Sequence, residues 1–163
     1  MKLSVIYDSV SGNTKQAAEY IVEGMSAEGA EAKAFPLTGV DYDFAKESAG
    51  LVFGTPTYLA GPTAAIYTWL EKESAKAEPA GKLGGAFATG GYIHGGEDLA
   101  IQRILTHLLV KGMMTHSGGG AHGAPVIHIG PVAIAPDIAS YKDLFVTYGK
   151  RFAAQAKKIG GEV

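Results

Sequence analysis

The chain of 163 residues contains no cysteine, which excludes disulfide bonds, iron–sulfur ligation and thiol chemistry. Charged residues are scarce, at 18%, and the formal net charge is −2, without a block of either sign. A nucleic-acid surface needs a basic face and a membrane anchor needs clustered Lys and Arg, so neither partner is expected. No apolar run approaches the roughly 18 residues of a membrane helix, and the N-terminus has no signal-peptide layout, so we expect a cytoplasmic protein.

Glycine is the residue in excess, with 23 of 163 positions. The glycines are not periodic, and they cluster at 81–96 and 112–130, between apolar runs. Glycine lets a backbone come close to a ligand, although tight turns in a loop-rich protein explain the excess equally well. The length and the 47% of apolar residues suit one globular domain over residues 1–163.

Apolar runs and helical patterns alternate along the whole chain. Strict alternation with uncharged strands predicts a parallel sheet covered by helices on both faces. Five strands in this arrangement match the flavodoxin-like doubly wound α/β fold, with strand order 2-1-3-4-5. The expected strands are 2–8, 30–37, 49–55, 82–89 and 130–136, and the expected helices are 14–27, 62–76, 98–111 and 140–158.

The first loop, DSVSGNTK (8–15), joins the first expected strand to the first helix. Ligands of such sheets bind outside the carboxyl ends of the strands, where the strand order reverses, and this loop lies there. Free backbone N–H groups at a helix N-terminus favour an anion, and hydroxyl and amide side chains add donors. The loop therefore predicts a phosphate site, with an ordinary helix N-cap as the alternative. The predicted binding residues are Ser9, Val10, Ser11, Gly12, Asn13 and Thr14.

The pattern [Ser/Thr]-x-[Ser/Thr]-Gly-x-Thr in this loop resembles the flavin mononucleotide (FMN) phosphate loop of flavodoxins. Two more segments resemble the WrbA-type NAD(P)H:quinone oxidoreductases: LVFGTPTYLAGPTAAIYTWLEK (51–72), with the second loop at 54–62, and FATGGYIHGGED (87–98), the third loop. The resemblance implies FMN, held additionally by Pro56, Thr57, Tyr58 and Leu59 of the second loop and by Thr89, Gly90, Gly91, Tyr92, His94 and Gly95 of the third.

The chemistry of the third loop also suits a flavin. A Thr-Gly-Gly turn can direct backbone N–H groups at the ring, where they stabilise the negative charge that develops on reduction. Tyr58 and Tyr92 either stack on the ring or are simply exposed loop residues. His94 either donates to the ring edge or to a quinone oxygen, or has no role; otherwise no catalytic side chain is expected, because the flavin performs the chemistry.

Other site types lack their motifs. There is no Gly-x-x-x-x-Gly-Lys-[Ser/Thr] loop and no Gly-x-Ser-x-Gly elbow. A Gly-x-Gly-x-x-Gly match at 118–123 is followed by a strand-like run where a dinucleotide fold needs a helix. His116, His122 and His128 recur every six residues, which is not the spacing of a zinc site, so no metal is expected.

Two main functional classes remain. The WrbA resemblance favours an enzyme that takes electrons from NAD(P)H and reduces a quinone or a similar small acceptor, as a homo-oligomer, either dimer or tetramer. The alternative is a flavodoxin-type carrier of single electrons between redox proteins, with a flavin-binding sensor or scaffold as a third option. A net charge of −2 gives little steering toward basic partner proteins, so the NAD(P)H-dependent quinone reductase is the main prediction.

Overall fold

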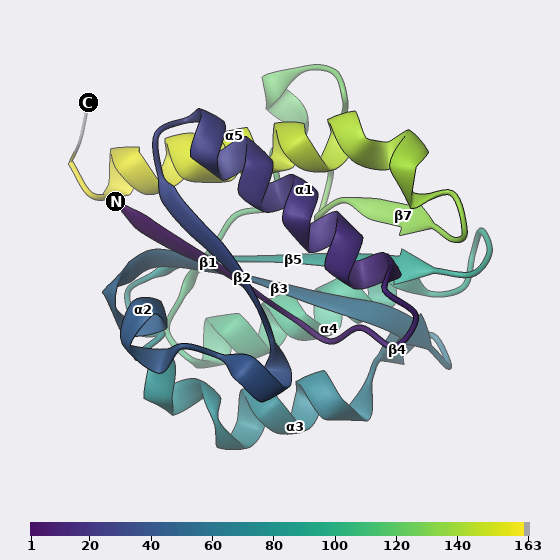
Figure 1. The fold of residues 1–163 in the computed structure, drawn as a ribbon, viewed down its shortest axis with the longest axis horizontal. Coiled ribbons are helices and arrows are strands. Elements are labelled where there is room, and N and C mark those ends of the chain that lie inside the picture. Colours follow the sequence, from purple (N-terminus) through teal and green to yellow (C-terminus); the bar gives the residue numbers. More distant parts are fainter. Residues whose placement is uncertain (162–163) are drawn as a thin grey trace.

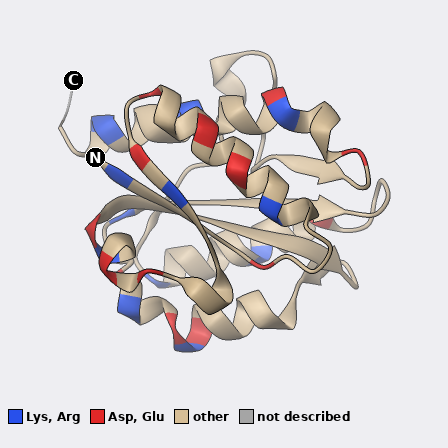
Figure 2. Ribbon diagram, in the orientation of Figure 1, with Lys and Arg blue, Asp and Glu red and all other residues tan. Residues whose placement is uncertain are grey.

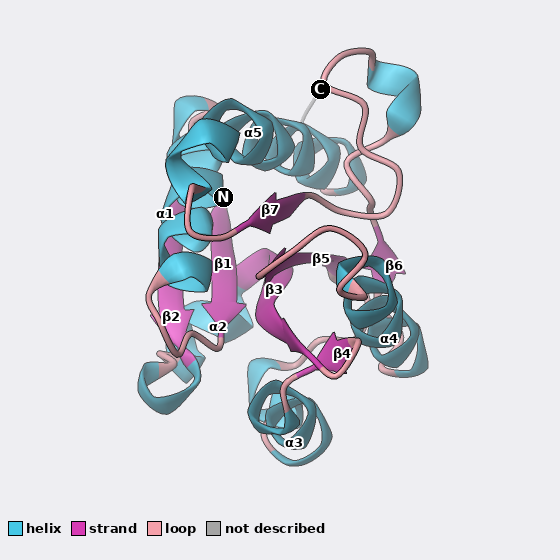
Figure 3. Ribbon diagram, turned by 90° about the vertical axis from the view of Figure 1, so that its right-hand side faces the viewer, coloured by secondary structure: helices cyan, strands magenta, loops and turns pink. Residues whose placement is uncertain are grey.

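The computed structural model describes residues 1–161. Its sheet is built on four parallel strands in the order β2 (Glu31–Pro36), β1 (Lys2–Tyr7), β3 (Ser48–Tyr58) and β5 (Leu83–Gly90). Figure 1 labels these strands, and Figure 3 shows their order from the side. β2 pairs only with β1, so it forms one edge of the sheet. The predicted flavodoxin-like, doubly wound α/β fold is therefore confirmed.

The strand order differs in detail from the prediction of five strands. Two short strands pair with β5 where a single fifth strand was predicted. β6 (Met114–Thr115) pairs with the start of β5, and β7 (Val132–Ile134) pairs with its end. A further short strand, β4 (Gly61–Pro62), folds back antiparallel on the end of β3. Within residues 1–161 the sheet thus has seven strands, because β4 is added and because the glycine-rich segment between β6 and β7 divides the last strand in two.

Arg151 holds the glycine-rich segment between β6 and β7 in place. Its guanidinium group donates hydrogen bonds to five backbone carbonyl groups of the segment, at distances of 2.9 to 3.4 Å. A guanidinium carries several donors in one rigid plane, so a single side chain can satisfy many carbonyls of an irregular loop. The five carbonyl groups belong to Gly118, His122, Gly123, Ala124 and Pro125.

Helices cover both faces of the sheet (Figures 1 and 3). α1 (Asn13–Ala27) and α5 (Lys142–Ile159) lie on one face, and α3 (Ala64–Lys72) and α4 (Glu97–Val110) lie on the other. No helix in residues 1–161 is both long enough and apolar enough to span a membrane. The prediction missed α2 (Tyr42–Glu47) and the 3-10 turns Leu37–Gly39 and Gly120–His122. The 3-10 turns Ser74–Ala77 and Ile138–Tyr141 lie at the ends of the predicted helices 62–76 and 140–158, which are shorter in the structure.

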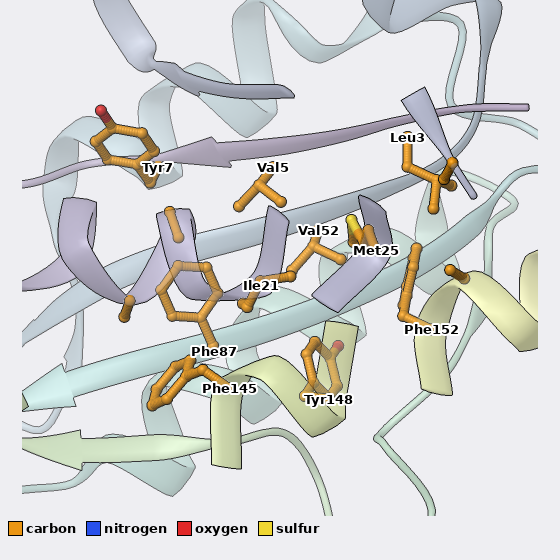
Figure 4. Close-up of a cluster of buried hydrophobic side chains, with 14 of the residues drawn as sticks. Leu3, Val5, Tyr7, Ile21, Met25, Val52, Phe87, Phe145, Tyr148 and Phe152 are labelled. Atoms are coloured by element: carbon orange, nitrogen blue, oxygen red, sulfur yellow. The ribbon is translucent and has the colours of Figure 1, made fainter. Parts of the chain in front are cut away.

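The two faces of the sheet have separate apolar cores, because successive residues of a strand point to opposite faces. The core beneath α1 and α5 is drawn in Figure 4 and includes Leu3, Val5, Val52, Phe87, Ile21, Phe145, Tyr148 and Phe152. The core beneath α3 and α4 includes Ile6, Leu51, Phe53, Ile66, Leu70, Ile101 and Ile104. Burial on both faces explains why the central strands read as uncharged runs.

Lys82 joins two helical segments at the amino end of β5. Its ammonium group donates to the carbonyl oxygens of Ala45 and Lys46 in α2, both at 2.7 Å, and of Ala77 at 2.8 Å. These carbonyls lie in the last turns of α2 and of the 3-10 turn Ser74–Ala77, where a positive charge is favourable.

Replacing Lys82 with Met should therefore lower the free energy of unfolding by about 2 kcal/mol, because three carbonyls lose a charged donor. Urea denaturation measures the change. Lys150→Met is the matched control, since Lys150 is exposed on α5, and it should leave stability nearly unchanged. Equal effects of the two substitutions would contradict a specific role for the Lys82 ammonium group.

Candidate functional site

Three loops meet at the carboxyl edge of the sheet, which faces the viewer in Figure 3. They surround a pocket of about 360 Å³. All three predicted loops contribute to its wall, although they are far apart in the sequence. The lining residues are Ser11, Asn13, Pro56, Thr57, Tyr58, Leu59, Thr89, Gly90, Gly91, Tyr92 and Ala135.

The first loop presents the N-terminus of α1 to the pocket. Gly12 precedes the helix with a φ of +91°, a conformation that glycine adopts without strain. The first backbone bond of the helix runs from Gln16 N–H to Gly12 O, at 3.0 Å, so the N–H groups of Asn13 and Thr14 have no intrahelical acceptor. The first turn of α1 contains no acidic residue. This helix end can therefore accept an anion.

Side chains of the first loop order the same helix end. Ser9 Oγ accepts the backbone N–H of Lys15 at 3.2 Å. Asn13 Nδ2 donates to Ser11 Oγ at 3.0 Å, which leaves the Ser11 hydroxyl proton available to a ligand. Ser11 and Asn13 line the pocket, whereas Ser9, Val10 and Gly12 do not.

Thr14 has a different position from the predicted one. The whole residue is 1% exposed, and its Oγ1 lies 2.9 Å from Oγ1 of Thr89 in a buried hydrogen bond. The hydroxyl therefore connects the first loop to the third and is not available at the pocket surface.

A second bridge connects the first loop to Thr63, the residue that follows the second loop. Thr63 Oγ1 donates to Asp8 Oδ2 at 2.6 Å and accepts the N–H of Ile66 at 3.3 Å, which makes Thr63 the N-cap of α3. Thr63 N–H in turn donates to Thr55 Oγ1 at 3.1 Å. The one carboxylate of the first loop is thus bound to Thr63.

The second loop is a tight hairpin between β3 and β4. Tyr58 pairs with Gly61, and the two residues between them, Leu59 and Ala60, have φ values of 50° and 57°. The Leu59 side chain is fully exposed. Thr57, which lines the pocket, has a buried Oγ1 with no hydrogen-bond partner within residues 1–161. A ligand with a polar edge can satisfy that hydroxyl.

The third loop places Gly90, Gly91 and Tyr92 in the wall of the pocket. His94, which has a φ of 63° and an exposed side chain, does not line it, and neither does Gly95. The prediction of a ring contact by His94 therefore has no support in the geometry of the pocket.

Sequence reasoning missed Ala135, which follows β7 and completes the wall beside Gly90. Ala135 N–H donates to Gly90 O at 2.7 Å, so the last strand fixes the third loop. The sequence contained a signal for Ala135, because this residue lies near the end of a predicted strand at the same edge of the sheet.

Burial raises the pKa of Tyr7, at the end of β1, so this phenol stays neutral and brings no charge to the neighbouring first loop.

The Thr14–Thr89 bond can be tested by a double-mutant cycle. Thr14→Val and Thr89→Val should each lower the free energy of unfolding by about 1–2 kcal/mol, because each leaves a buried hydroxyl without a partner. The double variant should be about 1 kcal/mol more stable than the sum of the single effects predicts. Strict additivity in urea denaturation would show that the two hydroxyls are not coupled.

Comparisons with known proteins agree on the family. The family model described as Flavodoxin matches residues 5–111. A flavodoxin of Clostridium saccharobutylicum is 41% identical over 160 residues, which cover 98% of this chain and 99% of that protein.

Solved structures agree on the fold. A WrbA-like flavodoxin from Agrobacterium tumefaciens superposes with a TM-score of 0.79 at 23% identity, over 96% of this chain and 98% of that chain. A flavodoxin of Fusobacterium nucleatum, solved with FMN bound, has a TM-score of 0.63 at 17% identity, over 99% and 98% of the two chains.

The expectation of an NAD(P)H-dependent quinone reductase is wrong. It rested on short segments around the second and third loops, whereas the match to the Clostridium saccharobutylicum flavodoxin extends over nearly the whole chain. The WrbA-like structure, at 23% identity, shows a common fold and nothing finer. From the family match and the whole-chain similarity together, the chain belongs to the flavodoxin family.

Proposed function

We propose that the protein is a flavodoxin-type electron carrier, which binds FMN in the pocket of the three loops and exchanges electrons with a redox protein. The observation that carries this proposal is the composition of the pocket. An uncharged, donor-rich helix N-terminus lies at one side, and two loops with an aromatic side chain each lie at the other. The FMN in the Fusobacterium nucleatum flavodoxin supports the same ligand.

The phosphate group of FMN fits the N-terminus of α1. The N–H groups of Asn13 and Thr14 and the Ser11 hydroxyl can donate to it, and the helix dipole favours its charge. Asp8, the carboxylate nearest in sequence, is bound to Thr63. A phosphate dianion would therefore be held by neutral donors.

The flavin ring fits the remaining part of the pocket. Tyr58 and Tyr92, on opposite loops, would lie against it, and the unpartnered Thr57 hydroxyl would serve its polar edge. An unpartnered buried hydroxyl costs about 1–3 kcal/mol, so a ligand that bonds to Thr57 gains affinity. When bound, the flavin supplies the electron-transfer chemistry, and the chain supplies position and electrostatics.

The rim of the pocket suits a protein partner with an apolar face. Large apolar side chains on the three loops and on the start of α4 are more than half exposed. The exposed charges nearby are few, and this edge, on the right of Figure 2, is largely uncharged. The apolar residues are Val10, Tyr58, Leu59, Tyr92, Ile93 and Leu99, and the charged ones are Lys15, Asp98 and Asp137.

The carrier function changes the expected partners. NAD(P)H, a quinone acceptor and a homo-oligomer all came from the resemblance to quinone reductases. A carrier needs only that the edge of the ring be accessible to a second redox protein. The exposed apolar rim supports the redox-protein option for the partner.

Binding of FMN through its phosphate can be tested against riboflavin, which lacks that group. The protein should bind FMN at least about 100-fold more tightly than riboflavin, because charge-assisted hydrogen bonds to the phosphate are lost. Ser11→Ala should weaken FMN about tenfold or more and change riboflavin binding little. Quenching of flavin fluorescence on titration measures both affinities.

Ser26→Ala is the matched control, because Ser26 is exposed at the other end of α1. It should leave both affinities unchanged. Equal affinity for FMN and riboflavin would contradict the phosphate site, and absence of binding to either would contradict the proposed function.

The carrier function also predicts the response to nicotinamides. The FMN-loaded protein should keep its visible absorption when mixed with excess NADH or NADPH, and should lose it on addition of dithionite. The physical reason is that hydride transfer needs a nicotinamide held against the ring, whereas a carrier only requires contact at the ring edge. Stopped-flow absorption measures the difference. Rapid bleaching by either nicotinamide would contradict the carrier.

A further inference from the structure

A groove beside the pocket of the three loops is bordered by the β3–β4 hairpin, α3 and α4. Two cavities of about 600 Å³ and 480 Å³ form it, and a smaller one of about 160 Å³ continues it along α4. In Figure 3, β4 lies between α3 and α4. Tyr58 and Leu59 line both the largest of these cavities and the pocket itself, so the groove and the pocket share the hairpin as a common wall.

Arg103, on α4, lines all three cavities of the groove. Among residues 1–161, it is the only Lys, Arg, Asp or Glu that does so. Its guanidinium group forms no ion pair with a carboxylate in this part of the chain. The groove therefore presents one positive charge that the chain itself does not neutralise.

Tyr67, on α3, holds the guanidinium group of Arg103 from one side. Arg103 Nη2 donates to Tyr67 Oη at 3.0 Å, and Arg103 Cζ lies 5.2 Å from the centre of the Tyr67 ring. The same ring packs edge-on against His107, with the ring centres 5.6 Å apart. A guanidinium has five N–H donors, so a carboxylate can still bind to it through two parallel bonds. Because the side chain is already oriented, such binding loses less entropy.

The surface around Arg103 is apolar. Leu59, Leu99 and Val110 each line one of the cavities and are more than half exposed, and Pro62 lines the two larger ones. Exposed apolar surface around an ordered arginine is typical of protein interaction sites. The complement of this surface is an apolar segment that carries a single acidic side chain.

We infer that the groove binds an acidic side chain of the redox-protein partner, flanked there by apolar residues. This inference rests on the proposed function. The partner's carboxylate binds the guanidinium group of Arg103, and its apolar neighbours cover the exposed side chains around it. Because the groove shares the hairpin with the pocket, a partner segment bound in it lies next to the flavin site. The apolar rim alone does not select a partner by charge, whereas Arg103 selects an acidic one and fixes its orientation.

Two other occupants of the groove differ from a partner segment in measurable ways. A small free carboxylate would use the guanidinium group of Arg103 but gain nothing from the apolar surface around it. A second copy of this chain would bind in the groove without any added molecule, to an extent that increases with protein concentration.

The experiment uses two synthetic peptides, acetyl-Leu-Glu-Leu-Phe-amide and the same peptide with Gln in place of Glu. Each is titrated into the ¹⁵N-labelled protein loaded with oxidised FMN, and NMR chemical shifts report where and how tightly it binds. The Glu peptide should shift the Arg103 Nε–H signal and the backbone N–H signals of Gly61 and Leu99, which line the groove. It should bind about tenfold more tightly than the Gln peptide, because a carboxylate forms charge-assisted hydrogen bonds with a guanidinium.

Arg103→Gln should remove the preference, so that both peptides bind equally weakly. Lys72→Gln is the matched control, because Lys72 is exposed at the end of α3, carries the same charge and does not line the groove. It should leave the tenfold preference unchanged. An equal loss of preference in both variants would overturn the inference, since it would show attraction by overall charge and not binding at Arg103.

The remaining outcomes separate the other occupants. Groove signals that do not shift, or equal binding of the two peptides to the wild-type protein, would overturn the inference. So would binding of propionate as tight as that of the Glu peptide, which would assign the groove to a small carboxylate. Groove signals that shift with protein concentration alone, and no longer do so in Arg103→Gln, would assign it to a second copy.

Titration with FMN distinguishes failure of this inference from failure of the proposed function. If the wild-type protein binds no FMN, the proposed function fails and the inference about its partner fails with it. If FMN binds but the Glu peptide is not preferred, the carrier function stands and only the role of the groove is lost.

Discussion

Hydrogen bonds between uncharged hydroxyls, or from a hydroxyl to a carboxylate, hold the three loops of the pocket in register. Thr14 binds Thr89 across the first and third loops, and Thr63, which follows the second loop, binds Asp8 of the first. A parallel sheet brings its strand ends to one edge, but it does not fix the loops that follow them. These two side-chain bridges do so without placing a free charge at the pocket. The neutral character of the site, on which the proposed binding of a dianion depends, thus follows from how the loops are joined.

Local sequence signals were sufficient for most of the fold and for the first loop. Uncharged strands and helical spacing depend on neighbouring residues, so the sheet, α1, α4 and α5 could be predicted within a few residues. The division of the last strand into β6 and β7 could not, because it depends on Arg151 holding a distant loop. The burial of Thr14 was missed for the same reason, since its partner is 75 residues away.

The functional error had a related cause. The segments that resemble quinone reductases line the pocket of this chain, where glycines and aromatic residues suit a flavin ring whatever reaction follows. Similarity confined to these loops therefore indicates the ligand better than the reaction. The whole-chain match to a flavodoxin includes the helices and the outer surface as well as the loops, and it therefore shows the family.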